Sequence, residues 1–382
     1  MLSAKSSPSA PPAPDFPRPA AGLDGRWYFG PGPSQLHPLV PGTLSRAVAE
    51  GLPSISHRSP RFRAEVARTR EALAELLSLP EGYRICYMGS ATEAMERIIQ
   101  GSVARRSFHL VNGSFSRRFR KVAVNLGREA DQVEARDGEG FELNGVQVPG
   151  GSELVALTLN ETSTGVALSP EGIRGVGERH PDVLMAVDGV SGTPAIPVEM
   201  SAVDALFFSV QKLFGLPAGL GVLVVSPRMA ERSFELEERG LPVGGYLHLP
   251  ALVRKADDDQ TVATPNALGI HLLGRVAEAF LETGLEGVQR ETGEKARLLL
   301  EAATAAGWEP FVAEADRSPT VLVFKVPGGS VEVRSRLEER GFLLGSGYGP
   351  YKAEHVRIAN FPAHTPEAVE ALARAIREEG SS

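Results

Sequence analysis

The sequence predicts an α/β fold, with a large domain built on a mostly parallel sheet covered by helices and a small C-terminal α+β domain. Three observations lead to this prediction. Short apolar runs alternate with helical patterns over about two hundred residues, as in parallel sheets covered on both faces. The pattern changes to short strands and amphipathic helices near the C-terminus. A chain of 382 residues that is 42% hydrophobic can also bury a large core.

Six apolar runs are the predicted strands of the large domain: Tyr83–Met88, Ser107–Val111, Glu153–Leu159, Val183–Val187, Leu206–Ser209 and Gly221–Val225. Helical patterns lie between several of them. One begins at Glu93, one runs from Phe115 to Leu126, and one covers Pro170–Arg179 after a Ser-Pro start signal. The alternation favours crossover connections between parallel strands.

The C-terminal part begins with a long helical pattern over Ala267–Ala306, interrupted near Gly284 and Gly287. Strands follow at Thr320–Val326, Phe342–Leu344 and His355–Ile358, and helices at Val331–Arg340 and Pro366–Glu379. The chain is therefore divided into three parts. Residues 1–22 form a disordered Pro/Ala/Ser-rich tail, residues 23–285 the large domain with N-terminal substrate loops, and residues 286–382 the small domain.

Charge and composition exclude several classes of protein. With 40 Lys and Arg against 47 Asp and Glu, the chain has no electrostatic footprint for nucleic acid, and the basic run 117–121 is read as a solvated helix face. The single cysteine, Cys86, excludes an internal disulfide and a cysteine-rich metal site. No apolar run reaches the roughly 18–20 residues of a membrane span, and no secretory signal is seen. We expect a soluble, cytoplasmic protein without a bound metal.

Polar and aromatic residues follow the ends of the predicted strands: Ser90, Phe115, Thr162, Asp188 and Lys212. In open α/β sheets, ligands bind outside the carboxyl ends of the strands. We therefore expect these five residues to share one site.

Lys212 and Asp188 carry the strongest chemical signal. Lys212 ends an apolar strand before a Gly/Pro-rich loop, where partial desolvation would lower the pKa of its amine and suit it to Schiff-base chemistry. The alternative is a surface lysine in a loop. Asp188 ends another apolar run, and a buried carboxylate there needs a partner. The pyridine nitrogen of pyridoxal phosphate is such a partner, because an aspartate keeps it protonated.

Other segments fit parts of an anionic, flat ligand. The small-residue turn Gly89–Thr92 before a helix could approach a phosphate. Phe115 could stack on a ring, and Asn160–Thr162 offers hydrogen-bonding groups at a strand end. His57 and Arg58 lie in a segment without apolar periodicity, and Arg357 is a cation inside a strand pattern, which suggests an anion partner. Each segment alone also fits a helix cap, a core residue, a turn or a surface charge.

Taken together from Tyr28 to Pro366, these segments resemble a class V, fold type I pyridoxal-phosphate aminotransferase. The motifs that carry the resemblance are Phe29–Ser34, Ile55–Ser59, Asn160–Thr162, Asp188 and Ser209–Lys212. The phosphoserine aminotransferases are the most similar branch, followed by the alanine– or serine–glyoxylate aminotransferases. The Asn-Glu-Thr motif, Phe115 and the Gln-Lys pair at 211–212 favour the phosphoserine branch.

The resemblance implies a role for each residue. Lys212 would form the internal aldimine with pyridoxal phosphate and move the proton between Cα and C4′. Asp188 would pair with the pyridine nitrogen, Phe115 would stack on the ring, and Thr162 would bond its phenolic oxygen region. The cofactor phosphate would be held by Ser90, the Ala91 backbone N–H, Gln211, and Thr264 from the other subunit. The substrate would be bound by Arg357 at its α-carboxylate, and by His57 and Arg58 at its phosphate or distal carboxylate.

The function that the resemblance implies is phosphoserine:2-oxoglutarate aminotransferase activity in serine biosynthesis. It would run as a two-half-reaction, ping-pong exchange in a homodimer with shared active sites. Two departures from the phosphoserine branch stand out. Ala263 replaces the usual Asn before Thr264, which bears on a cross-subunit contact to the cofactor phosphate, and the loop Gly345–Lys352 lacks a His-Arg pair, which bears on a phosphorylated substrate. An alanine/serine–glyoxylate aminotransferase is the alternative. A non-catalytic pyridoxal-fold binding protein is a remote one, against which Lys212 and Asp188 argue.

Overall fold

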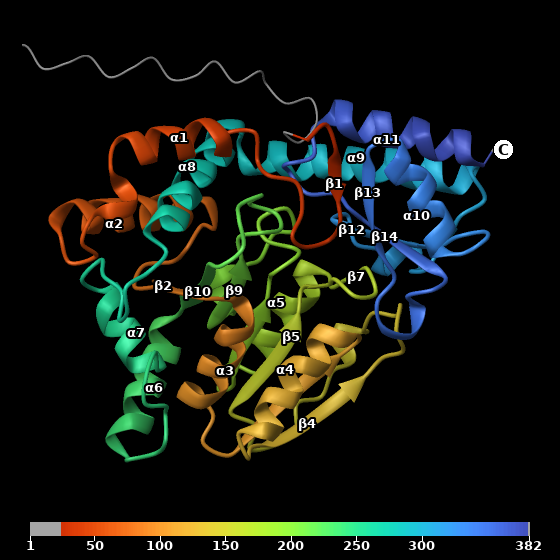
Figure 1. Cartoon of the computed structure of the whole chain (residues 1–382). Helices are drawn as coiled ribbons and strands as arrows, with labels where there is room; N and C mark the ends of the chain where they lie inside the picture. The colour runs from red at the N-terminus through yellow and green to blue at the C-terminus, as the bar shows by residue number, and fades with distance from the viewer. Residues whose placement is uncertain (1–23, 381–382) are drawn as a thin grey trace, which may run out of the picture.

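A seven-stranded sheet forms the centre of the large domain in the computed structural model, which describes residues 24–380 (Figure 1). The tail predicted at residues 1–22 lies outside this range. The strand order is β2-β10-β9-β8-β5-β3-β4, and only β10 runs antiparallel to its neighbours. The strands are β2 (Arg84–Met88), β3 (Arg106–Val111), β4 (Glu129–Glu134), β5 (Leu154–Thr158), β8 (Leu184–Asp188), β9 (Ala205–Ser209) and β10 (Gly221–Val225). The predicted fold class is confirmed.

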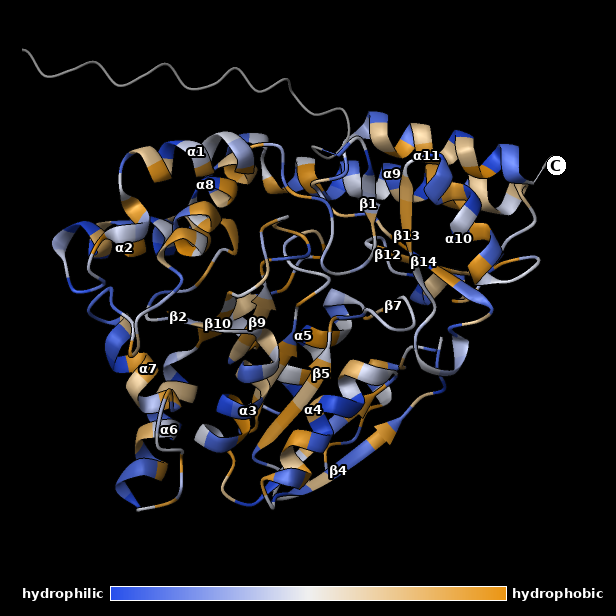
Figure 2. Cartoon of the chain, in the orientation of Figure 1, coloured by the Kyte–Doolittle hydropathy of each residue, from blue (hydrophilic) through white to orange (hydrophobic). Residues whose placement is uncertain are grey.

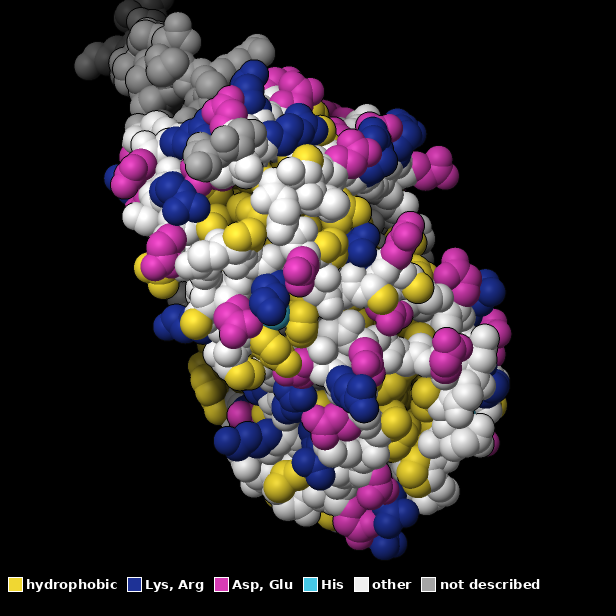
Figure 3. Space-filling model, turned by 90° about the vertical axis from the view of Figure 1, so that its right-hand side faces the viewer, with side chains coloured by type: hydrophobic (Ala, Val, Ile, Leu, Met, Phe, Trp, Pro, Cys, Tyr) yellow, Lys and Arg dark blue, Asp and Glu magenta, His cyan; other side chains and the backbone are white. Residues whose placement is uncertain are grey.

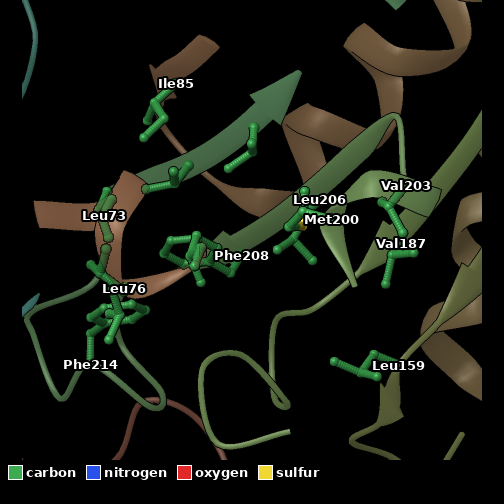
Figure 4. Close-up of a cluster of buried hydrophobic side chains, with 14 of the residues drawn as sticks. Leu73, Leu76, Ile85, Leu159, Val187, Met200, Val203, Leu206, Phe208 and Phe214 are labelled. Atoms are coloured by element: carbon green, nitrogen blue, oxygen red, sulfur yellow. The ribbon is translucent and has the colours of Figure 1, made fainter. Parts of the chain in front are cut away.

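Helices cover both faces of this sheet because its central strands are apolar on both sides. Alternate residues divide between two cores: Leu206 and Phe208 face one, Ala205 and Phe207 the other. The first core, seen in Figure 4, packs against α1 (Val40–Ala49), α2 (Pro60–Leu76), α5 (Pro170–Arg179) and α8 (Ala267–Thr283). The second packs against α3 (Ala91–Ser102), α4 (Ser114–Asn125), α6 (Pro227–Glu238) and α7 (Leu249–Ala256).

The small domain contains a five-stranded sheet of order β1-β13-β14-β12-β11. Its strands are β1 (Trp27–Phe29), β11 (Glu309–Pro310), β12 (Val321–Lys325), β13 (Phe342–Ser346) and β14 (His355–Ala359), and its helices are α9 (Leu285–Ala305), α10 (Ser330–Glu339) and α11 (Pro366–Glu379). β1 pairs in parallel with β13. The N-terminal strand thus lies in the C-terminal sheet, although the sequence division gave residues 23–285 to the large domain. A three-residue strand carries no local signal of the sheet that it joins.

The remaining elements are short. A two-stranded ribbon, β6 (Asn160–Glu161) and β7 (Val166–Ala167), follows β5. Single 3₁₀ turns occupy η1 (Leu52–Ser54), η2 (Leu143–Gly145), η3 (Met200–Ala202), η4 (Glu314–Asp316) and η5 (Gly349–Tyr351). The expected break in the long helix is at Gly284, whose φ of 77° ends α8 and begins α9.

Hydropathy and charge follow this architecture. In Figure 2 the strands β5 and β9 are largely hydrophobic, whereas the edge strand β4 is mostly hydrophilic, which is why the apolar-run criterion missed it. Figure 3 shows basic and acidic side chains interspersed on the face in view. None of the helices formed by residues 24–380 is long and apolar enough to cross a membrane.

Candidate active site

A cavity of about 250 Å³ lies between the carboxyl ends of the large sheet's strands and the small domain. Eight residues singled out in the sequence line it: Ser90, Ala91, Phe115, Thr162, Asp188, Gln211, Lys212 and Arg357. Parallel strands bring them together because their carboxyl ends meet at one edge of the sheet. A second cavity, of about 310 Å³, is lined by residues such as Leu76, Thr193 and Met200 and by none of the predicted site residues.

Lys212 follows β9, and its side chain is buried in the cavity wall. Its Nζ donates a hydrogen bond to Thr162 Oγ1 at 2.9 Å, and that hydroxyl donates to Ser191 Oγ at 2.8 Å. Burial lowers the pKa of the Lys212 amine, and the negative charge of Asp188 opposes part of this effect. The site therefore holds an amine that gives up its proton more easily than an exposed lysine.

Asp188 ends β8 and is also buried. Its Oδ1 accepts the Val190 N–H at 3.0 Å, and within residues 24–380 the carboxylate forms no ion pair at salt-bridge distance. Burial raises the pKa of Asp188, and the Val190 hydrogen bond and the Lys212 charge oppose the rise. A buried carboxylate in this state is suited to a cationic partner that enters the cavity.

Phe115 lies in the first turn of α4, and Glu161 holds that turn in place. The fully buried Glu161 carboxylate accepts the backbone N–H groups of Phe115 at 3.1 Å and Ser116 at 2.9 Å. It also accepts the hydroxyl groups of Ser116 at 3.0 Å and Ser163 at 2.6 Å. A carboxylate at a helix N-terminus is stabilised by the free N–H groups and the helix dipole. Sequence reasoning missed this role because the two segments are far apart along the chain.

The turn after β2 places the N-terminus of α3 at the cavity. Ser90 caps this helix by accepting the Glu93 N–H at 3.2 Å. The Ala91 N–H, which the resemblance assigned to the cofactor phosphate, donates instead to Ser209 Oγ at 2.9 Å in this structure. Gly221 allows the close approach, because a Cβ there would lie 2.4 Å from the Ser90 carbonyl carbon. The small residues thus permit tight packing of this turn against β10.

Arg357 reaches the cavity from β14 of the small domain. Its Nε donates to the Ser346 carbonyl at 2.8 Å and its Nη1 to the Thr162 carbonyl at 3.0 Å. Burial lowers the pKa of Arg357 to about 10. The guanidinium therefore links the two domains and is fixed in orientation beside Lys212.

Three predicted residues, His57, Arg58 and Thr264, do not line the cavity within this chain. The Arg58 guanidinium donates to Gln260 Oε1 at 2.7 Å and to the Thr261 carbonyl at 3.0 Å. Arg58 therefore fastens its own loop to the segment that carries the exposed Thr264.

Two further cavity residues were missed or misread in the sequence. Tyr348 lines the cavity from the loop after β13, with its ring centroid 5.6 Å from that of Phe115. The reading of 117–121 as a solvated helix face is wrong for Arg118, which lines the cavity, and right for the exposed Arg117, which pairs with Glu134 and Asp137. The sequence spacing could have predicted the position of Arg118. Residues three apart share a helix face, and Arg118 is three residues after Phe115, which was already expected in the site.

The donor set of this cavity fits pyridoxal phosphate. It combines a buried amine at Lys212, a buried carboxylate at Asp188 that has no ion-pair partner among residues 24–380, and an aromatic ring at Phe115. The neighbouring Asn160 Oδ1 is buried and, within the described residues, has no hydrogen-bond partner, so it can accept a bond from a ligand group.

Comparisons with known proteins agree with this reading. The family model for class V aminotransferases matches residues 27–372. A phosphoserine aminotransferase of Rhodococcus opacus is 32% identical over 359 residues, which cover 92% of this chain and 94% of that protein. The crystal structure of a phosphoserine aminotransferase from Cytophaga hutchinsonii is 40% identical with a TM-score of 0.91, covering 93% of this chain and 99% of that one. An aspartate aminotransferase from Thermus thermophilus is 27% identical with a TM-score of 0.81, over 93% and 99% of the two chains. The chain belongs to the class V aminotransferases, enzymes that work with pyridoxal phosphate.

Proposed function

We propose that the enzyme transfers the amino group of O-phospho-L-serine to 2-oxoglutarate in serine biosynthesis, in the cytoplasm. The observation that carries the proposal is the 40% identity, at a TM-score of 0.91, to a phosphoserine aminotransferase. The curated relatives at 31–32% identity are named as phosphoserine aminotransferases, some of them as putative ones. A cavity that contains several cations and one carboxylate also suits a substrate with anionic groups.

The side chains divide the work of transamination. Pyridoxal phosphate, when bound, supplies an electron sink for the electrons of the substrate Cα–H bond. Lys212 takes the proton from Cα and returns it during the exchange, and its lowered pKa favours the neutral amine that this needs. Asp188 would keep a proton on the pyridine nitrogen and Phe115 would pack against the ring of the cofactor, and Thr162 orients Lys212 through their 2.9 Å hydrogen bond.

Arg357 binds the α-carboxylate of both the amino donor and the oxo-acid acceptor. Its backbone contacts to Ser346 and Thr162 use only part of the guanidinium and fix its plane, so a carboxylate can bind to the remaining N–H groups. Because the same group serves both half-reactions, it supports a ping-pong exchange at one site. Ser90 and Gln211 contribute to the binding of the cofactor phosphate.

We assign the enzyme a homodimeric state in which Thr264, His57 and Arg58 complete the site of the partner subunit. These residues are outside the cavity of their own chain but are joined to each other through the hydrogen bonds of Arg58 to residues 260 and 261. Exposed apolar side chains at Leu39, Val48 and Tyr246 are available for burial between subunits. Sedimentation at decreasing protein concentration should reveal a dimer; an active monomer with full cofactor affinity would contradict the assignment.

Amino-donor profiling tests the function. The purified enzyme is assayed with phosphoserine, serine and alanine against 2-oxoglutarate and glyoxylate. We expect the highest kcat/KM for phosphoserine with 2-oxoglutarate. The absence of a His-Arg pair from the loop Gly345–Lys352 keeps an alanine/serine–glyoxylate aminotransferase as the second candidate, and a preference for serine or alanine with glyoxylate would select it.

A Lys212→Ala variant tests the site itself. It should lose the visible absorption of a protonated Schiff base and the adduct that borohydride reduces. A variant that kept both would refute the assignment of Lys212.

A further inference from the structure

Arg118 is a cation of the cavity to which the proposed function gives no task. Its side chain is partly buried, and its guanidinium makes no hydrogen bond and no ion pair with any residue from 24 to 380. The other two cations of the cavity are engaged: Lys212 bonds Thr162, and Arg357 bonds two backbone carbonyls. A guanidinium has five N–H donors, and leaving all of them without a protein acceptor in a partly buried position is costly unless a ligand or water accepts them.

The surroundings of Arg118 indicate the type of ligand. Its Cζ lies 5.1 Å from the centroid of the Phe115 ring, and Lys212 Nζ lies 5.2 Å from the same centroid. The N-cap Ser90 and the first helical residues Ala91 and Thr92 of α3 line the same cavity, and α3 packs against α4. A helix N-terminus and a guanidinium that open onto one cavity both favour a negatively charged group.

The charge balance supports the same ligand class. Among the cavity-lining residues, Arg118, Lys212 and Arg357 stand against the single carboxylate of Asp188. Burial raises the pKa of Asp188 and lowers that of Lys212, and the positive charge of Arg118 is a smaller influence that favours a lower pKa for both groups. In the proposed function Arg357 takes the α-carboxylate and the uncharged Ser90 and Gln211 contribute to the cofactor phosphate, so no cation of this chain's own cavity has yet been assigned to a phosphate.

We propose that Arg118 binds a phosphate monoester in this cavity through its guanidinium. Two phosphates can enter the site: that of the cofactor and, on the basis of the proposed function, that of phosphoserine. The planar fork of the guanidinium matches two phosphate oxygens, which a lysine amine cannot do.

Three variants test the proposal. Arg118→Gln removes the charge, Arg118→Lys keeps the charge without the fork, and Arg117→Gln is the matched control on the solvent side of the same helix. Arg117 pairs on the surface with Glu134 and Asp137, and such exposed pairs contribute little to stability. Urea unfolding first confirms that each variant is folded.

Two measurements distinguish the sources of phosphate. In the first, the apoenzyme is titrated with pyridoxal phosphate and with pyridoxal, and dissociation constants are taken from absorbance. In the second, the enzyme loaded with pyridoxal phosphate is titrated with phosphoserine and with serine, and binding is taken from the spectral change. Neither measurement depends on turnover.

Arg118→Gln should raise the dissociation constant of at least one phosphorylated ligand about tenfold or more relative to that of its unphosphorylated counterpart. The dissociation constant of Arg118→Lys should lie between those of Arg118→Gln and the wild type. If only the affinity for pyridoxal phosphate falls, Arg118 binds the cofactor phosphate. If only the affinity for phosphoserine falls, Arg118 binds the substrate phosphate. Changes below twofold in both phosphate ligands, or equal losses for phosphorylated and unphosphorylated ligands, overturn the proposal. A wild-type enzyme that does not prefer phosphoserine would refute the proposed function, while the cofactor titration would still test Arg118.

Discussion

Replacing Glu161 by Gln tests whether one buried carboxylate sets the position of the aromatic ring in the active site. Glu161 lies under the N-terminus of α4, and its two oxygens accept hydrogen bonds from Phe115, Ser116 and Ser163. Glutamine has almost the same shape but only one acceptor oxygen. Its NH₂ group must then face donors that the carboxylate accepted.

The magnitude follows from these contacts. If the amide NH₂ faces Ser163, the Ser163 hydroxyl can turn to accept, but the Ser163 N–H loses its acceptor. An unsatisfied buried N–H costs about 1–3 kcal/mol. Losing the charge at the helix N-terminus costs about another 0.5–2 kcal/mol. We expect Glu161→Gln to lower the free energy of unfolding by about 3 kcal/mol.

The assay is urea unfolding of the apoenzyme together with absorbance titration with pyridoxal phosphate. Because α4 carries Phe115, the variant should also bind pyridoxal phosphate more weakly. Ser163→Ala is the comparison variant: it keeps the carboxylate but removes the hydroxyl bond to Glu161 and the acceptor of the Ser114 N–H, and should cost about 2 kcal/mol. A Glu161→Gln variant no less stable than Ser163→Ala, with wild-type affinity for the cofactor, would refute the reasoning.

Three further predictions concern Gly32, the cavity carboxylate of Asp188 and the buried His109. Gly32→Ala should weaken pyridoxal phosphate binding about tenfold, because the φ of Gly32 is +136° and the new Cβ would lie 2.9 Å from Lys212 Cε. Absorbance titration with pyridoxal phosphate measures the effect. Gly30→Ala is the control that should bind normally, because its Cβ would meet no atom closer than 3.7 Å. Asp188→Asn should still bind the cofactor but reduce kcat by at least about 100-fold in steady-state assays, and a smaller loss would remove Asp188 from its assigned role. Burial lowers the pKa of His109 from 6.5 to about 3 in the folded protein. As pH falls below 6.5, the His109 ring therefore takes up a proton in the unfolded chain but not in the folded one, and the free energy of unfolding decreases. Between pH 7 and pH 4, the free energy of unfolding of His109→Gln, measured by urea unfolding, should therefore fall by about 3 kcal/mol less than that of the wild type. Parallel plots of unfolding free energy against pH for the two proteins would contradict the assignment.

The sequence alone was sufficient for the elements whose signals are local. The segments 170–179, 221–225 and 366–379 have the same bounds in the sequence prediction and in the structure. The sequence also predicted that four residues line one cavity, because each lies at or after the end of an apolar strand, and the carboxyl ends of parallel strands converge at one edge of the sheet. These residues are Lys212, Asp188, Phe115 and Thr162.

The tertiary structure decided the features that depend on contacts between distant segments. β1 pairs with β13, Glu161 caps α4, and Arg58 bonds the segment before Thr264, and in each case the partner lies on another part of the chain. Arg118 belongs to the same group, because its basic run is typical of an exposed helix and only the packing of α4 against α3 places it in the cavity. Local sequence patterns specify which face of a strand or helix is apolar. The packing of the elements then determines which element covers that face and which polar side chain is left in a cavity without a protein partner.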